Sequence, residues 1–117
     1  MKHDQGNLLV VDDNQLNRNL LVRRVKRQGH MTSSASDGFQ ALEMVRNKSF
    51  DLVLLDIMMP QMNGYQVLET IKTDSGLRHI PVIMISAVDD IESMVRCIEL
   101  GAEDYLSKPF VLSLIHI

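Results

Sequence analysis

The chain has 117 residues, of which 45% are hydrophobic and 23% are charged. This length fits one hydrophobic core, and the composition excludes a disordered tail and a membrane protein. The formal charge of -3 is mild, and basic residues alternate with acids along most of the chain, so no direct contact with nucleic acid is expected. The single cysteine, Cys97, cannot form an internal disulfide, and no signal-peptide pattern is present, which favours a cytoplasmic location. We therefore treat residues 1–117 as one domain.

The spacing of apolar residues predicts strands and helices in strict alternation. In chain order, strands are expected at 8–11, 31–34, 52–55, 82–85 and 104–106, and apolar residues recur at helical spacing at 21–25, 41–45, 68–71 and 91–98. The first, third and fourth strand segments are nearly all apolar, as is typical of strands that are covered on both faces. The other two are placed mainly by their position in the alternation.

Polar and glycine residues mark the ends of the predicted helices. Gly29 and Gly101 stand where the first and fourth helices should end, and Asp37 and Asp89 precede helical segments as N-caps. Five strands and four helices in this order imply right-handed crossovers with helices on both faces of a parallel sheet. The predicted fold is a flavodoxin-like, doubly wound α/β sheet with strand order 2-1-3-4-5, which binds ligands beyond the carboxyl ends of its strands.

Polar side chains gather at those strand ends. Asp12 and Asp13 follow the first strand, Asp56 the third and Ser86 the fourth, and Lys108 comes shortly after the fifth. A single Asp after a strand is commonly a turn former or a helix cap. The significance lies in the coincidence of four strand ends that meet at one edge of the predicted sheet.

The residue types at this edge favour phosphoryl chemistry. Three carboxylates in one cleft repel each other, so they need a cation, or one of them must stay protonated. Oxygen ligands select a hard metal, and Mg²⁺ suits a site with few protein ligands. Asp56 is centrally placed to act as a nucleophile toward phosphorus, with Lys108 as a mobile positive charge and the Ser86 hydroxyl as a donor to a phosphoryl oxygen.

Four segments in the right order resemble the receiver domains of response regulators and hybrid histidine kinases. They are LVVDDN at 9–14, LLDIMMPQMNGY at 54–65, IMISA at 83–87 and GAEDYLSKPF at 101–110, so the likeness covers residues 8–110. The resemblance implies a phosphoacceptor that takes a phosphoryl group from a phosphohistidine on a histidine kinase or a histidine phosphotransfer protein. It further implies an output domain or a second receiver that binds through the fourth helix and fifth strand. Such a domain is not a turnover enzyme.

The resemblance also implies a role for each residue of the site. Asp56 would be the phosphoacceptor, Asp13 a direct Mg²⁺ ligand and Asp12 a ligand mainly through water, with the backbone carbonyl of Met58 as a further ligand. Ser86 would move toward the phosphoryl group, and Lys108 would pair with it. Tyr105 would be the aromatic switch residue whose rotamer follows Ser86.

Three alternative classes share parts of this pattern. A haloacid dehalogenase-like phosphotransfer enzyme wants a second Asp two residues after the nucleophile, where this chain has Met58. A flavodoxin-like cofactor binder should present hydroxyls and amides to an anionic phosphate, which Asp12 and Asp13 would repel. A phosphate-independent pseudo-receiver would not need the combination of Asp13, Asp56, Ser86 and Lys108.

The end of the chain departs from the family pattern. A fifth helix is expected after Phe110, but the seven residues that follow carry no convincing amphipathic pattern, so this helix is expected to be truncated. Residues 112–117 are interpreted as a non-native tail.

Overall fold

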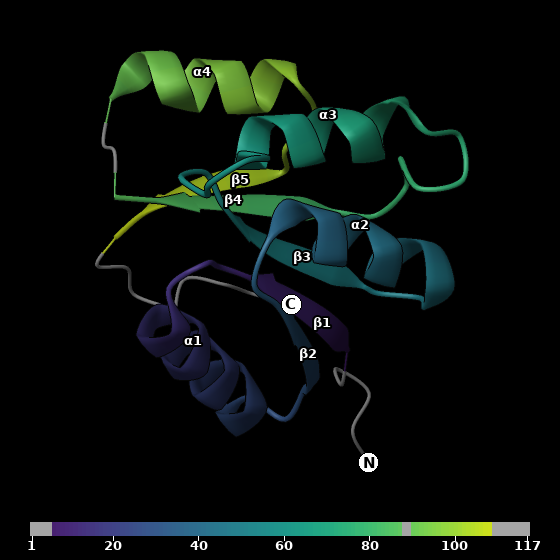
Figure 1. Ribbon diagram of the computed structural model, residues 1–117, viewed down its shortest axis with the longest axis vertical. Helices are drawn as coiled ribbons and strands as arrows, with labels where there is room; N and C mark the ends of the chain where they lie inside the picture. Colours follow the sequence, from purple (N-terminus) through teal and green to yellow (C-terminus); the bar gives the residue numbers. More distant parts are fainter. Residues whose placement is uncertain (1–5, 88–89, 109–117) are drawn as a thin grey trace.

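The structure is a computed structural model of the chain, and it describes residues 6–87 and 90–108. Strands and helices alternate as predicted (Figure 1). In chain order the elements are β1 (Asn7–Val11), α1 (Gln15–Arg27), β2 (Met31–Ala35), α2 (Gly38–Asn47), β3 (Leu52–Asp56), α3 (Gly64–Thr73), β4 (Val82–Ser86), α4 (Ile91–Glu99) and β5 (Asp104–Ser107). The expected fifth helix falls within residues 109–117, outside the described part of the chain.

The five strands form one parallel sheet in the order β2-β1-β3-β4-β5, which confirms the predicted topology. In the register, Val11 of β1 lies beside Ala35 and Leu55, Asp56 of β3 beside Ile85, and Ser86 beside Ser107. The carboxyl ends of β1, β3, β4 and β5 are therefore level at one edge of the sheet. Asp56 and Ser86 are the last residues of their strands, one residue later than the predicted ends.

Helices cover both faces of the sheet, because alternate residues of each strand point to opposite sides. On one face, Leu21 and Val25 of α1 pack against Leu8 and Val10 of β1 and Leu54 of β3. The other face carries the larger core, in which α2, α3 and Cys97 of α4 pack against the alternate residues of the same strands. Figure 1 shows α1 alone on its side and the other three helices on the opposite side.

The helix ends follow local rules, with one correction. Asp37 caps α2 as predicted, and Gly29 and Gly101 have positive φ values of 93° and 106° just after their helices. The N-cap of α4 is Asp90, whose side chain accepts from the Ser93 backbone N–H. The predicted cap, Asp89, lies outside the described residues.

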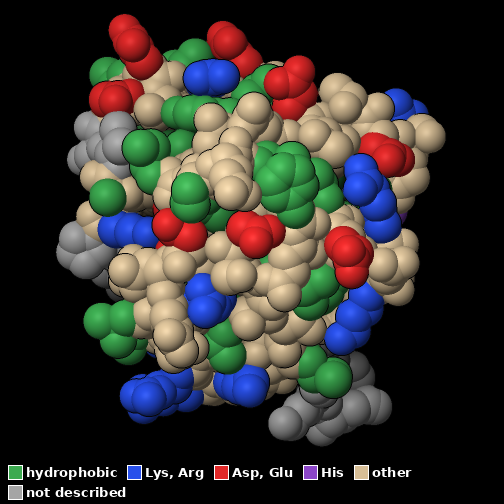
Figure 2. All heavy atoms as spheres, in the orientation of Figure 1, with side chains coloured by type: hydrophobic (Ala, Val, Ile, Leu, Met, Phe, Trp, Pro, Cys, Tyr) green, Lys and Arg blue, Asp and Glu red, His purple; other side chains and the backbone are tan. Residues whose placement is uncertain are grey.

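The fourth helix forms where its period predicts, but its apolar residues face outward. Ile91, Met94, Val95 and Ile98 are 75%, 41%, 46% and 49% exposed, and only Cys97 of this helix is buried. Figure 2 shows hydrophobic and acidic side chains together at the top of the molecule, where α4 lies. None of the helices in the described part of the chain has the length and apolar character needed to cross a bilayer.

Candidate metal and phosphoacceptor site

The acidic residues come together at the carboxyl ends of β1 and β3. Asp12 and Asp13 directly follow β1, and Asp56 ends β3, the strand that pairs with β1. One carboxylate oxygen from each of the three residues lies within 4.8 Å of the others. Asp12 and Asp56 are buried, whereas Asp13 is exposed, so the cluster has a dry inner side and one side open to water.

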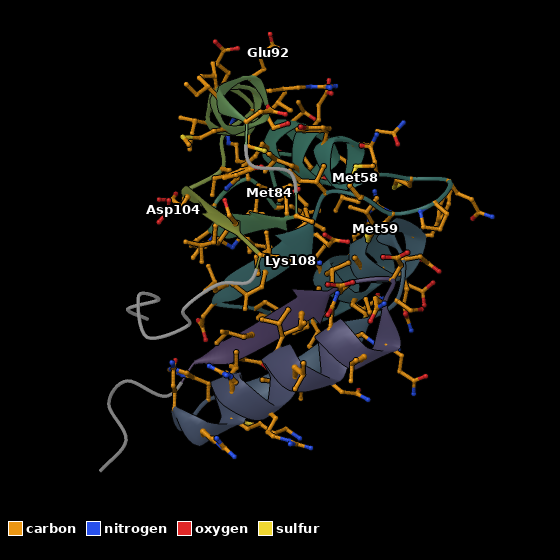
Figure 3. All side chains as sticks on the ribbon, turned by 90° about the vertical axis from the view of Figure 1, so that its left-hand side faces the viewer. Met58, Met59, Met84, Glu92, Asp104 and Lys108 are labelled. Atoms are coloured by element: carbon orange, nitrogen blue, oxygen red, sulfur yellow. The ribbon has the colours of Figure 1, made fainter. Side chains whose placement is uncertain are left out.

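Lys108 closes the inner side of this cluster. Its ammonium nitrogen Nζ donates to Asp12 Oδ2 at 3.0 Å and to Asp56 Oδ1 at 3.2 Å. The backbone N–H of Lys108 donates to the Ser86 carbonyl at 2.7 Å, so the residue is fixed to the end of β4. In Figure 3, Lys108 lies at the end of β5.

Asp12 is held in place by the loop that follows β1. Its Oδ1 accepts from the Asn14 backbone N–H at 2.9 Å, and its own N–H donates to the Ala35 carbonyl at 3.2 Å. The Arg18 guanidinium donates to the Asp12 carbonyl at 2.8 Å, a contact that the sequence gave no reason to expect. Because Arg18 lies one turn into α1, this contact ties the helix to the acidic loop.

Burial and mutual repulsion set the protonation of the central carboxylate. Burial raises the pKa of Asp56 from 3.8 to about 6, and the charge of Asp12 adds to the rise, while Lys108 opposes it without cancelling it. Burial by itself would lower the pKa of Lys108, but the hydrogen bond to Asp12 and the charges of both carboxylates raise it. The lysine therefore keeps its positive charge, and ionisation of Asp56 is less favourable than for an exposed carboxyl group.

Gly64, the first residue of α3, is in close contact with the backbone of the phosphoacceptor candidate. A Cβ at Gly64 would collide with the Asp56 carbonyl oxygen and would lie 2.7 Å from the Ile57 Cα. The Gly64 N–H also donates to the Ile57 carbonyl at 2.8 Å. The start of α3 and the end of β3 therefore form one rigid unit, which a bulkier residue at Gly64 would force apart.

Ser86 and Tyr105 form a buried pair beside the acidic cluster. Ser86 is fully buried, and the Tyr105 ring is 8% exposed within the larger core. Burial raises the pKa of Tyr105, and the hydrogen bond between its side chain and that of Ser86 works in the opposite direction. The two predicted switch residues are thus in direct contact.

The methionines of the loop after β3 divide into two groups. Met59 is buried and Met62 packs against the core. Flexible methionine side chains commonly fill irregular gaps in a hydrophobic core in this way. Met58 is 63% exposed, so its side chain does not pack there. Ile57 and Met59 on either side of it are buried, and Met58 lies exposed between them.

These features define a class of protein. A doubly wound parallel sheet gathers three carboxylates and one lysine at the carboxyl ends of its strands, where such folds bind ligands. The oxygen-only acidic group suits a hard divalent cation, and the lysine suits an anion beside that cation. The class is therefore an α/β protein with an acidic, lysine-paired cluster at the carboxyl edge of its sheet, compatible with a divalent cation.

The chain belongs to the response regulator receiver domain family of two-component systems, whose sequence profile matches residues 8–116. It is 42% identical over 106 residues to the "Probable transcriptional regulator ycf27" of Cyanidium caldarium, covering 91% of this chain and 41% of that protein. It is 41% identical over 102 residues to the "Response regulator PleD" of Caulobacter vibrioides, covering 87% of this chain and 22% of that protein. The chain thus spans less than half the length of these curated relatives.

Solved structures agree with this assignment. A putative response regulator from Chloroflexus aurantiacus superposes with a TM-score of 0.89 at 27% identity, covering 94% of this chain and 90% of that one. Receiver domains bind Mg²⁺ at an acidic Asp cluster, and the group formed by Asp12, Asp13 and Asp56 is compatible with such a site.

Proposed function

We propose that Asp56 accepts a phosphoryl group from a phosphohistidine in a Mg²⁺-dependent reaction, and that the modified domain then switches a surface that binds a partner. The observation that carries this proposal is the contact of Lys108 with both Asp12 and Asp56 at the acidic edge of the sheet. The two residues that Lys108 joins are 96 and 52 positions away in sequence. A bridge between such distant positions is expected of a functional site more than of a local turn.

The residues present fit a magnesium ion. Asp13 and Asp56 would hold Mg²⁺ directly, Asp12 would hold it mainly through water, and the Met58 carbonyl would complete the protein ligands. When bound, the ion neutralises negative charge on the phosphoryl oxygens. The exposure of Asp13 leaves a side through which a hydrated cation can enter.

In the transfer step, an ionised Asp56 oxygen attacks the phosphorus and forms an O–P bond, while the N–P bond of the phosphohistidine breaks. The electron pair of that bond stays on the imidazole nitrogen, and the imidazole leaves as the partner's histidine. Asp56 must be ionised to react, and burial opposes its ionisation, so the positive charge of Lys108 is needed beside it. Lys108 can then pair with the added phosphoryl oxygens.

The switch would run through Ser86 and Tyr105. The added charge of about -2 attracts the Ser86 hydroxyl and Lys108 toward the phosphoryl group. Because Ser86 contacts Tyr105, a shift of the serine changes the position in which the tyrosine ring is most stable. The buried Tyr105 of this structure corresponds to the inward position of the ring.

The partner surface would be the outer face of α4 together with β5. Four hydrophobic side chains of α4 are exposed to water along one side of the helix: Ile91, Met94, Val95 and Ile98. A binding partner would remove this apolar surface from water. The relative from Cyanidium caldarium is named as a transcriptional regulator, and the curated relatives extend well beyond the receiver. An output domain or a second receiver is therefore the proposed partner, and a histidine kinase or histidine phosphotransfer protein the proposed donor.

The described geometry disfavours the alternative classes. A haloacid dehalogenase-like enzyme needs an acid at position 58, and the exposed Met58 cannot transfer a proton. A pseudo-receiver has no use for a buried Asp56 whose pKa is raised to about 6. The domain is thus proposed as a phosphoacceptor, not as a turnover enzyme.

The test is phosphorylation by acetyl phosphate with and without Mg²⁺, followed by intact mass. The wild type should gain one phosphoryl mass only with Mg²⁺, and Asp56→Ala should gain none. Asp51→Ala offers a matched control, because Asp51 lies just before β3 at the opposite end of the strand. A wild type that never gains a labile phosphoryl group, or an Asp56→Ala variant that gains the same one, would refute the proposal.

A further inference from the structure

A stacking contact joins α4 to α3 close to the proposed site. The guanidinium carbon of Arg96 lies 4.0 Å from the centroid of the Tyr65 ring. Arg96 is itself exposed, and Tyr65 is half-buried against the larger core. Cys97 is the one buried residue of α4, and the Arg96 stack adds a contact between this helix and α3.

Tyr65 has a fixed position relative to the phosphoacceptor candidate. It directly follows Gly64, which touches the Asp56 backbone so closely that no Cβ fits there. It lies in the first turn of α3, where Asn63 and Gln66 form a capping box with reciprocal hydrogen bonds of 3.0 and 2.9 Å. The backbone of Tyr65 is therefore held close to the end of β3, and Arg96 of α4 contacts the ring of this residue.

The same region contains the buried switch pair. Tyr105 and Cys97 belong to the same buried cluster, and Tyr65 packs against that cluster. The stack of Arg96 on Tyr65 therefore joins α4 to a residue that packs against the cluster containing Tyr105. Tyr65 thus links Arg96 of α4 to the start of α3, which packs on the Asp56 backbone.

We infer that Arg96 is a positioning residue whose stack on Tyr65 holds α4 in the arrangement that accompanies the inward Tyr105. This inference rests on the proposed function, because it requires that occupation of the Asp56 site favours the same arrangement. A contact that forms in only one of two arrangements of α4 stabilises that arrangement. If ligand binding at Asp56 favours the same arrangement, the contact strengthens binding, and binding strengthens the contact. Loss of the stack should therefore weaken binding at Asp56, although Arg96 does not touch the site.

The experiment measures the affinity for beryllofluoride in Mg²⁺ by ¹⁹F NMR. Arg96→Gln and Tyr65→Leu should each weaken binding about two- to fivefold, the range expected for one exposed cation–π contact. The double variant should be no weaker than the worse single variant, because both changes remove one contact. Tyr65→Phe keeps the ring and should bind like the wild type.

Two further variants separate stacking from other roles of Arg96. Arg96 lies in the last turn of α4, where a positive charge favours the helix dipole. Arg96→Lys keeps that charge but lacks the planar guanidinium, so its affinity should lie between those of the wild type and Arg96→Gln. Arg46→Gln, an exposed arginine of α2 without a ring contact among the described residues, should leave the affinity unchanged.

The outcomes distinguish this inference from the proposed function. If the wild type does not bind beryllofluoride in Mg²⁺, the proposed function is refuted, and the inference with it. If the wild type binds and Arg96→Gln and Tyr65→Leu bind equally well, only the role of Arg96 is overturned. Additive effects in the double variant, with thermal unfolding of the single variants unchanged, would equally overturn it.

Discussion

Replacing Asp56 by asparagine should stabilise the ion-free protein above pH 6, although the substitution removes the proposed phosphoacceptor. Burial raises the pKa of Asp56 from 3.8 to about 6, and Asp12 contributes to the rise. In the unfolded chain the carboxyl group ionises near its ordinary pKa. Ionisation therefore costs more in the folded protein than in the unfolded chain, and the neutral amide avoids that cost.

The direction of the pH dependence follows from the raised pKa. Below pH 3.8 the carboxyl group is protonated in both states, so the two proteins should be about equally stable. As the pH rises toward 6, the wild type loses stability relative to the variant, and above pH 6 the difference is constant. A shift of about 2 units at about 1.36 kcal/mol each gives up to about 3 kcal/mol. For a domain of this size this is on the order of 10 °C in Tm.

The assay is urea unfolding of wild type and Asp56→Asn in EDTA between pH 4 and pH 8. Glu43→Gln provides the control, because it removes the same charge at an exposed position of α2 and should show no such pH-dependent gain. Added Mg²⁺ should then stabilise the wild type more than Asp56→Asn, since a cation relieves the repulsion that the amide has already removed. A variant that is no more stable than the wild type at pH 8 would show that Asp56 is not strained in the ion-free fold.

Three further outcomes follow from the geometry. Gly64→Ala should lower the free energy of unfolding by about 2 kcal/mol or more and abolish phosphorylation, because its Cβ collides with the Asp56 backbone. Gly76→Ala is the control, since its Cβ would meet only Asp74 Oδ1 at 3.3 Å, and it should have neither effect. Urea unfolding and intact mass measure the two effects. The Cys97 thiol, whose pKa burial raises to about 11, should resist iodoacetamide at pH 8 until the protein unfolds, and rapid labelling of the native state would contradict its burial. Replacing the exposed, apolar Met58 by Asn or Asp should speed hydrolysis of the acyl phosphate, because it could position a water; an unchanged half-life would oppose this role.

Most of the fold was predictable because its signals are local and repeated. Nearly continuous apolar runs at 8–11, 52–55 and 82–85 leave few options besides buried parallel strands, and alternation with helices fixes the topology. The choice between Asp89 and Asp90 as the α4 cap was not predictable, because adjacent aspartates have the same capping chemistry. The extra residue at the ends of β3 and β4 depends on how far the neighbouring strand continues the ladder, which no single segment specifies.

The membership of the site was predictable to the extent that it depends on topology alone. Strand order brings Asp12, Asp13 and Asp56 to one edge, but it does not say which side chain turns inward. The burial of Asp12 and the exposure of Asp13 depend on the path of the loop, as does the double contact of Lys108. The contact of Arg18 with the Asp12 carbonyl had no sequence signal at all.

The fourth helix shows why periodicity identifies a helix without identifying its buried side. Its apolar residues recur at i, i+3, i+4 and i+7, the spacing of a core-facing stripe, yet that stripe is exposed and Cys97 is buried instead. Cys97 is the residue of α4 that joins Tyr105 and the β4 residues Val82 and Met84 in the buried cluster, so the side of the helix that carries Cys97 faces the sheet. A helix with a weak inner attachment and an apolar outer face can shift when a small change occurs beneath it. The proposed mechanism therefore uses two features of the fold. The unfavourable ionisation of Asp56 is relieved by an added ligand, and α4, with one buried residue, can move in response and change the surface.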